Sequence, residues 1–214
     1  MRASGGLAVA NLPAPDLAYN SRAGHATGLA TTSLSVTLSG VAADMDLLAI
    51  VSTRDAATVT TPSGWALLAT YPGDGASASR FRIYTIVAAG GETNVTFACS
   101  STNISASVLA FTGGGVIGNT WETTAFSFST AIQANGVTVL GGSYRISMWA
   151  ADQNDVAITP PSGGTVVTNI ATTSRDHNTI WIEGPLSAGA AVNKTATYGS
   201  AANYKAATLE MRPT

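Results

Sequence analysis

The chain has 214 residues and a formal net charge of −2, and only 10% of its residues are charged, against about 25% in an average soluble domain. With 45% hydrophobic residues it can build a core, which excludes a disordered chain, and it lacks the clustered Lys and Arg that nucleic-acid binding needs. No stretch approaches the roughly 18 apolar residues of a membrane span, and a single cysteine, Cys99, excludes an intrachain disulfide.

The N-terminal segment, residues 1–30, shows little periodicity and contains Pro13, Pro15, Gly24 and Gly28. Its opening apolar stretch covers about five residues, fewer than the roughly 7–15 that a secretory signal peptide requires, so no signal peptide is expected. We predict an extended arm over residues 1–30. Two alternatives stay open for this arm: a loose tail, or a segment that becomes ordered against a neighbouring subunit.

Residues 31–113 carry a pattern of short strands. Thr, Ser, Val and Ile dominate, and no long stretch has the apolar spacing of an amphipathic helix. The expected strands lie near Ser33–Leu38, Asp46–Ser52, Ala66–Thr70, Arg80–Ala88, Thr93–Cys99 and Ser105–Phe111. Turns are expected at Thr61–Gly64 and Tyr71–Gly75, where proline fixes φ and glycine supplies positive φ.

Residues 114–214 continue the pattern after the glycine run Gly113–Gly115, which is typical of a linker or a tight crossing. The expected strands lie near Ala125–Ser129, Tyr144–Ala151, Thr165–Asn169, Asn178–Glu183, Asn193–Tyr198 and Tyr204–Arg212. Short strands at about 8–15-residue spacing predict β-sandwiches of an immunoglobulin-like or jelly-roll-like type. Closure of the first sandwich is expected to bury one alternating face, made of Leu47, Ala49, Val51, Phe81, Ile83, Thr85 and Val87.

The two units resemble each other at a spacing of 99 residues. Val59–Gly64 matches Ile158–Gly163 at this spacing. Further pairs, some shifted by one residue, are Ala89–Gly90 with Ala188–Gly189, Asn94 with Asn193, and Leu109 with Leu209. Such self-similarity predicts a duplicated unit. The sequence therefore predicts an all-β chain of two tandem β-sandwich domains, 31–113 and 114–214, related by an internal repeat of about 99 residues.

No catalytic or metal-binding constellation emerges from the sequence. The histidines, His25 and His177, lie in an irregular segment and an expected loop, and no Gly-x-Ser-x-Gly motif accompanies them. Asp152 and Asp155 belong to an oxygen-rich stretch that lacks the Asp-x-Asp-x-Asp-Gly pattern of a calcium loop. A turn is favoured there, and no pair of carboxylates can be argued to converge. We assign no catalytic residue, no cofactor and no metal.

The tryptophans and the cysteine are interpreted as packing residues. Trp149 and Trp181 lie within expected strands, Trp65 directly follows a turn, and Trp121 lies near the join of the two units. The alternative role for these rings is a platform that stacks sugars, because aromatic faces are flat and apolar. Cys99 lies in an alternating run and is expected to be a small core residue rather than a reactive thiol.

A succession of motifs in the first unit resembles a known class of proteins. The motifs are Thr61–Leu68 (Thr-Pro-Ser-Gly-Trp-Ala-Leu-Leu), Arg80–Tyr84, Gly90–Thr93 and Val108–Phe111. A Pro-x-Gly-Trp turn, a basic-aromatic strand, a Gly-Glu-Thr turn and a final strand ending in an aromatic residue resemble phage virion structural proteins and related bacterial surface proteins. In the second unit Gly164 stands in place of the tryptophan. The resemblance implies a β-sandwich that serves as a structural or attachment module without catalytic residues.

These observations lead to a hypothesis with two rivals. The leading hypothesis is a non-enzymatic bacteriophage virion protein, a capsid decoration or cement protein or a head appendage, made in the host cytoplasm. It would dock through many weak contacts with other virion proteins and with copies of itself, using the N-terminal arm and one apolar sheet face. The alternative is a tail-associated module that binds a host receptor or surface glycan. The third is an enzyme that acts on cell-wall polysaccharide. Neither nucleic acid nor a membrane is expected as a partner.

Overall fold

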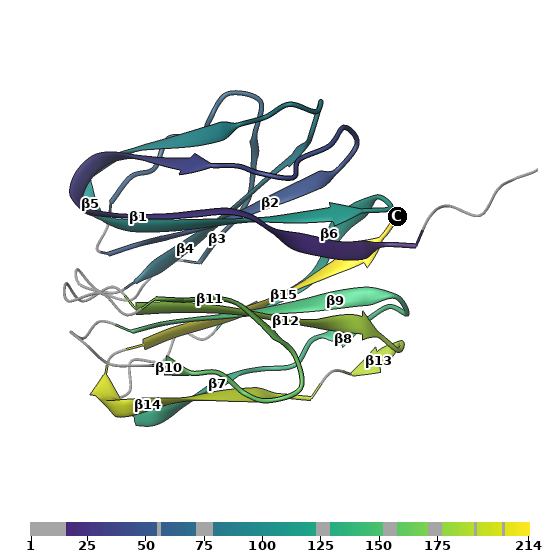
Figure 1. Cartoon of the computed structure of the whole chain (residues 1–214). Coiled ribbons are helices and arrows are strands. Elements are labelled where there is room, and N and C mark those ends of the chain that lie inside the picture. The colour runs from purple at the N-terminus through teal and green to yellow at the C-terminus, as the bar shows by residue number, and fades with distance from the viewer. Residues whose placement is uncertain are drawn as a thin grey trace, which may run out of the picture.

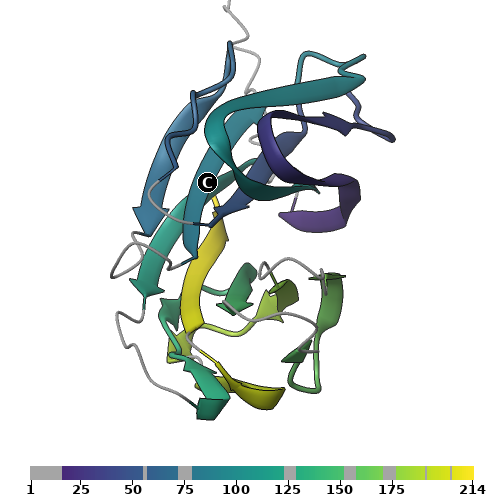
Figure 2. The ribbon, with the colours of Figure 1, turned by 90° about the vertical axis from the view of Figure 1, so that its left-hand side faces the viewer.

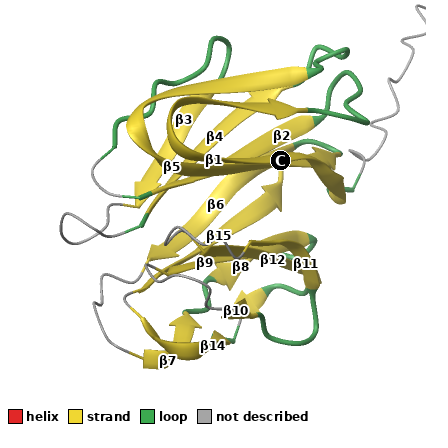
Figure 3. Cartoon of the chain, turned by 60° about the vertical axis from the view of Figure 1, so that its left-hand side comes forward, coloured by secondary structure: helices red, strands yellow, loops and turns green. Residues whose placement is uncertain are grey.

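A computed structural model describes residues 16–54, 57–71, 79–122, 129–151, 158–170, 177–190, 192–202 and 204–214. Every helix or strand in these residues is a β-strand, as Figure 3 shows, which confirms the prediction of an all-β chain. Across the same residues, no helix has the length and apolar character needed to cross a membrane.

The chain before Gly113 forms one five-stranded antiparallel sheet, called the first sheet, in the order β1-β5-β2-β4-β3. Its strands are β1 (Ala18–Thr37), β2 (Asp46–Thr53), β3 (Ala66–Tyr71), β4 (Arg80–Val87) and β5 (Asn94–Thr112). All eight residues of β2 are buried. A strand that is buried along its whole length and contains a continuous apolar run is typical of a sheet that is covered on both faces.

The chain after Gly114 forms a second sheet in the order β11-β12-β9-β15-β6, a three-stranded third sheet in the order β10-β14-β7, and the pair β13-β8. The strands are β6 (Gly115–Glu122), β7 (Ser129–Ala134), β8 (Thr138–Val139), β9 (Ser143–Ala151), β10 (Ile158–Thr159), β11 (Thr165–Ile170), β12 (His177–Leu186), β13 (Gly189–Ala190), β14 (Lys194–Ala202) and β15 (Tyr204–Pro213). At the join, Gly113 has a φ of 93°, and a Cβ there would lie 2.3 Å from the Asp16 carbonyl oxygen. Only glycine suits that position.

The sheets are stacked in layers, with the first sheet above the second and the third sheet below it in Figure 1. Strands β1 and β5 curl over the first sheet (Figure 2), and β1 bends where its register with β5 shifts between Gly28 and Ser33. One apolar core lies under the curl, around Val36 and Phe97. A second joins the first and second sheets, and a third joins the second and third sheets. Both five-stranded sheets are therefore covered on both faces.

Most predicted strands are found within a few residues of their expected bounds, and the expected turn at Thr61–Gly64 is present. Two predictions are corrected: β1 begins at Ala18 rather than near Ser33, and β5 is one long strand rather than two. Residues 18–30 of the expected arm thus pair with β5, while residues 1–15 and the expected turn at Tyr71–Gly75 extend outside the described residues. Strands β6, β8, β10 and β13 are additional to the predicted ones. The expected strand Ala125–Ser129 lies outside the described residues except for Ser129, where β7 begins.

The expected buried face of the first unit is also corrected. Leu47, Ala49 and Val51 face the core under the curl. Phe81 and Ile83 lie on the opposite face of the sheet, in the core shared with the second sheet. Val87 is exposed. The prediction of one buried face assumes a single sandwich, which has one core. The first sheet is covered on both faces, so alternate residues along its strands are buried in two different cores.

Candidate functional site

An apolar groove lies where β3 of the first sheet meets β6 and β15 of the second sheet. Its volume is about 250 Å³, and it is lined by Leu68, Thr85, Gly115, Val116, Ile117 and Met211. We call it the β3–β6 groove. Leu68 and Val116 are 44% and 41% exposed, whereas Met211 belongs to the core between the two sheets. The floor of the groove is therefore the edge of that core.

The exposure of Leu68 follows from an irregularity in β3. The register of β3 with β4 shifts between Leu67 and Ala69, so Leu68 is an extra residue opposite β4, and both leucines are exposed. Val87 follows Thr85 by two residues on β4, so the two side chains share one face of the strand, and Val87 is 63% exposed. Exposed apolar side chains thus extend beyond the groove along its rim.

Asp46 fixes the far end of the groove. Its Oδ2 accepts a hydrogen bond of 2.7 Å from the backbone N–H of Gly115, which holds the start of β6 against the start of β2. Burial raises the pKa of Asp46, and the hydrogen bond from Gly115 partly opposes this effect. Asp46 is a structural carboxylate at a strand end.

The seam between β1, β5, β11 and β12 is polar, in contrast to the groove. Arg22 donates a hydrogen bond of 3.0 Å to the Val167 carbonyl oxygen, and Ser107 Oγ lies 2.8 Å from Thr168 Oγ1. Asn178 also donates to Ser105 Oγ. These residues, together with His25, are called the polar seam. Direct hydrogen bonds between the two sheets close the interface here.

His25 and Ser107 form the closest approach to a nucleophile–base pair among the described residues. His25 Nδ1 lies 2.9 Å from Ser107 Oγ. However, Ser107 is only 1% exposed, and its hydroxyl is also bonded to Thr168. A serine enclosed between two sheets cannot reach a substrate, so this pair is not placed for acyl transfer. The pair joins β1 to β5 within the first sheet, and the bond of Ser107 to Thr168 connects it to the second sheet.

Acidification is expected to weaken the fold through His25. Burial lowers the pKa of His25, and the charge of Arg22 lowers it further, although a backbone hydrogen bond at Ala106 opposes both. The unfolded chain therefore binds a proton at about pH 6.5 while the folded chain does not, and the free energy of unfolding falls as the pH drops below that value. Urea unfolding at pH 7.5 and 5.5 should show a larger loss for the wild type than for His25→Asn. An equal loss in both proteins would contradict this assignment.

A row of charged residues crosses the second sheet on its other face. Arg145 pairs in register with Glu183 on one side and with Glu210 on the other. Arg145 forms an ion pair with Glu183 and lies 5.7 Å from the centre of the Trp181 ring. Lys194 lies 3.0 Å from Glu183 and 5.0 Å from the same ring. The charges are paired with one another, which fits a structural network.

Glu210, like Arg145, is fully buried. It accepts hydrogen bonds from the backbone N–H groups of Asn119 and Leu140, at 3.0 and 2.7 Å, and from the Ser143 hydroxyl at 2.7 Å. Burial alone would raise the pKa of Glu210, but these three donors and the charge of Arg212 outweigh burial and lower it. The carboxylate thereby ties β6 and the β8–β9 turn to β15.

The tryptophans with described side chains pack inside the protein. Trp149 and Trp181 are fully buried, and Trp149 donates a hydrogen bond to the Ile132 carbonyl oxygen. Trp65 is partly buried, with its ring centre 6.4 Å from that of Phe97. The side chain of Trp121 is outside the described part. No Trp, Tyr or Phe is among the exposed large hydrophobic residues of the described ranges.

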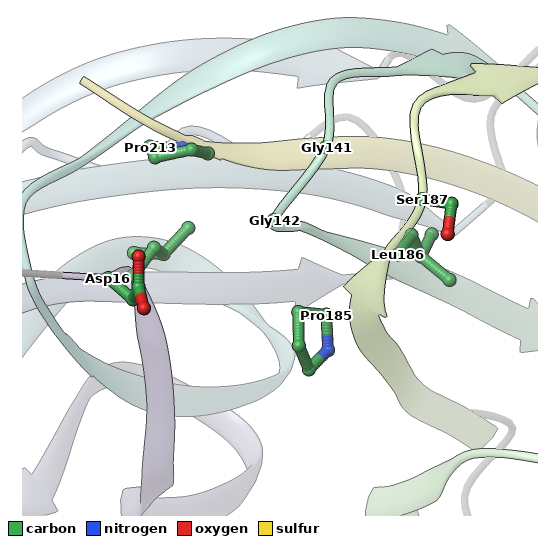
Figure 4. A pocket seen from close by; sticks show the side chains of 8 residues that line it. Asp16, Gly141, Gly142, Pro185, Leu186, Ser187 and Pro213 are labelled. Carbon is green, nitrogen blue, oxygen red and sulfur yellow. The ribbon is translucent and has the colours of Figure 1, made fainter.

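A second cavity, of about 370 Å³, lies at Asp16, the first described residue, and is shown in Figure 4. Its walls are Asp16 and Leu17, the turn at Gly141–Gly142, the segment Pro185–Ser187, and Pro213. The described part of the chain begins here, beside the C-terminal end of β15.

The remaining candidates bring no chemistry together in the described residues. His177 begins β12, but its side chain is outside that part, as are Asp152 and Asp155. Cys99 is half-buried, donates weakly to the Thr31 carbonyl oxygen at 3.5 Å, and has a pKa raised by burial. Within the described ranges, no three His, Cys, Asp or Glu residues gather as a metal site would require.

Comparison with known proteins gives no relative: no family model, no curated protein and no solved structure matches the chain. The functional argument therefore rests on the chain itself. Sequence reasoning did not identify the β3–β6 groove, because its walls come from strands on different sheets. One signal was available: Leu67 and Leu68 are consecutive apolar residues in a strand where alternation is expected.

Proposed function

We propose that this chain is a non-enzymatic structural protein of a bacteriophage virion, a capsid decoration or cement protein or a head appendage. Two observations support the proposal: the motifs from Thr61 to Phe111 resemble such proteins, and the β3–β6 groove offers an exposed apolar docking surface. The groove carries the proposal, because exposed Leu68 and Val116 line one apolar hollow rather than lying singly on the surface, and contiguous apolar surface marks docking sites. The partners would be other virion proteins and further copies of this chain.

The mechanism would be multivalent docking. A groove of about 250 Å³ accommodates only a few side chains, so one contact would be weak. On a lattice, each additional contact of the same subunit forms at high effective concentration, and many weak contacts become stable together. A body whose sheets are joined by apolar cores suits this role, because it presents the groove in a fixed orientation. The proposal assigns no catalytic residue, cofactor or metal.

We further infer that the chain is a pair of β-sandwich domains related by a repeat of about 99 residues. The strand order β1-β5-β2-β4-β3 of the first sheet corresponds to β6-β15-β9-β12-β11 of the second. In both sheets the register of the last hairpin shifts at the same place, between Leu67 and Ala69 and between Val166 and Thr168.

Compensating changes in side-chain size at corresponding positions of the two halves also support the repeat. Trp65 corresponds to Gly164 in the repeat. A Cβ at Gly164 would lie 2.4 Å from the ring of Trp181, so this larger ring fills the space in the second half. In the first half, Tyr84 is at the position of Trp181, opposite Leu67 as Trp181 is opposite Val166.

Charged substitutions in the groove are expected to abolish docking. Leu68→Asp and Val116→Asp each place a carboxylate on an apolar contact, and the binding affinity for phage particles made without this protein should fall at least about ten-fold. Both side chains are more than one-third exposed, so stability should change little. Cosedimentation with the particles measures binding.

The matched control is Val166→Asp. Val166 is 45% exposed and lies on β11, the edge strand of the second sheet. This variant should bind particles like the wild type. Equal binding by all four proteins would remove the groove from the mechanism, and absence of binding by the wild type would overturn the proposed function.

A further inference from the structure

The N-terminal end of the described chain approaches the β3–β6 groove at Gly115, on the β6 side, whereas β1 and β3 themselves are opposite edges of the first sheet. A Cβ at Gly115, which lines the groove, would lie 2.9 Å from Leu17 Cδ1 and 2.5 Å from Met211 Cε. Leu17 follows Asp16 at the cavity of Figure 4. The described chain therefore begins close to Gly115, where β6 starts.

The composition of residues 1–15 matches the groove. They contain one charged residue, Arg2, and an apolar run from Leu7 to Ala10 that is followed by Leu12. The residues that line the groove are also uncharged. Fifteen residues span at most about 50 Å when extended, which is enough to cross to another molecule.

The groove also offers backbone partners. Strand β3 is an edge strand of the first sheet, and among the described strands none pairs with its outer side along Ala66–Thr70. It contains neither proline nor a charged residue, the two devices that commonly protect a sheet edge. An extended apolar segment could add to this edge and place alternate side chains in the groove.

Pro13 and Pro15 favour a neighbouring molecule over the chain's own groove. Proline fixes its own φ and keeps the preceding residue extended, so Leu12 to Pro15 are expected to project the apolar run away from its root. Folding back would need a reversal within these residues. Because Leu17 lies near Gly115 of the groove, two copies that meet there could each place their N-terminal segment in the groove of the other. This reciprocal contact gives a closed two-fold dimer.

We propose that residues 7–12 of one copy occupy the β3–β6 groove of a second copy, beside strand β3. This inference rests on the proposed function, since it names a partner for the same groove. It assigns the groove to the contact between two copies and leaves the contact with other virion proteins to the remaining surface. A groove substitution then weakens particle binding because single copies, unlike pairs, attach to the lattice at one point only.

Disulfide trapping in the full-length chain tests the pairing. In a Cys99→Ser background, Val9→Cys combined with Val116→Cys should give interchain disulfides on mild oxidation, seen as dimers on a non-reducing gel. The control is Val9→Cys combined with Val166→Cys, whose second site lies on the other edge strand. We expect at least about ten-fold more dimer from the first pair, and less when Leu7→Asp is added.

Three outcomes would overturn the inference: an intrachain disulfide, which places the segment in its own groove; equal dimer yields from both cysteine pairs; or a dimer yield that Leu7→Asp leaves unchanged. Failure of the proposed function is distinguishable. Copies that crosslink through Val9 and Val116 but do not bind particles support the pairing and contradict the virion role. Particle binding without crosslinking contradicts the pairing alone.

Discussion

Replacing Glu210 with alanine is expected to lower the free energy of unfolding by at least about 3 kcal/mol. The carboxylate is fully buried and accepts three hydrogen bonds, from Asn119, Leu140 and Ser143. Removing it leaves the buried Ser143 hydroxyl and the part-buried N–H groups of Asn119 and Leu140 without their acceptor. Each hydrogen bond to a charged group contributes about 1.5–3 kcal/mol. Urea unfolding followed by tryptophan fluorescence measures the change, because Trp149 and Trp181 lie in the same half of the chain.

Glu92→Ala is the matched control for this prediction. Glu92 also accepts two backbone hydrogen bonds, from Ala89 at 2.6 Å and Gly90 at 3.0 Å, but it does so at the surface. Water can replace the lost acceptor there, so the change should be much smaller. Similar losses for Glu92→Ala and Glu210→Ala would contradict the role assigned to the buried carboxylate.

Replacing Phe111 with alanine is expected to lower the free energy of unfolding by about 3–5 kcal/mol. Phe111 is fully buried, and its ring centre lies 5.5 Å from that of Tyr19 and 5.8 Å from that of Tyr144. Tyr144 belongs to the second sheet, so the substitution opens a cavity between the two halves. One cooperative transition, reported alike by tryptophan fluorescence and by circular dichroism, should shift as a whole.

The control for Phe111→Ala is Val87→Ala, which removes an exposed side chain and should leave the transition within about 0.5 kcal/mol of the wild type. Two separate unfolding transitions in Phe111→Ala would be compatible with a wild type whose two halves unfold together. Two separate transitions in the wild type itself would show that the core between the sheets does not couple them.

The sequence was sufficient for the strands whose pattern is local. Residues 46–52 and 80–88 are rich in β-branched and apolar residues between turn residues, and the strands there were located within two residues. The first half of β1 and strand β6 were missed because they form sheet edges with mostly exposed or half-buried side chains. Without a buried face, an edge strand has no hydrophobic period to read.

The core between the two halves could not be read from the sequence. In β2, the position of Leu48 is as apolar as that of Leu47, but nothing local says that the two face different cores. The same limitation applies to the groove, whose walls Leu68 and Val116 are 48 residues apart in sequence and on different sheets. Assigning these residues requires the relative placement of the sheets.

The most direct test of the virion role is electron microscopy of phage particles made without this protein and then incubated with it. The account predicts many copies at regular positions on the capsid, and few or none when Leu68→Asp is used instead. Copies restricted to the tail would contradict a capsid role and point to a receptor- or glycan-binding module. No bound copies of the wild type would contradict a virion role altogether.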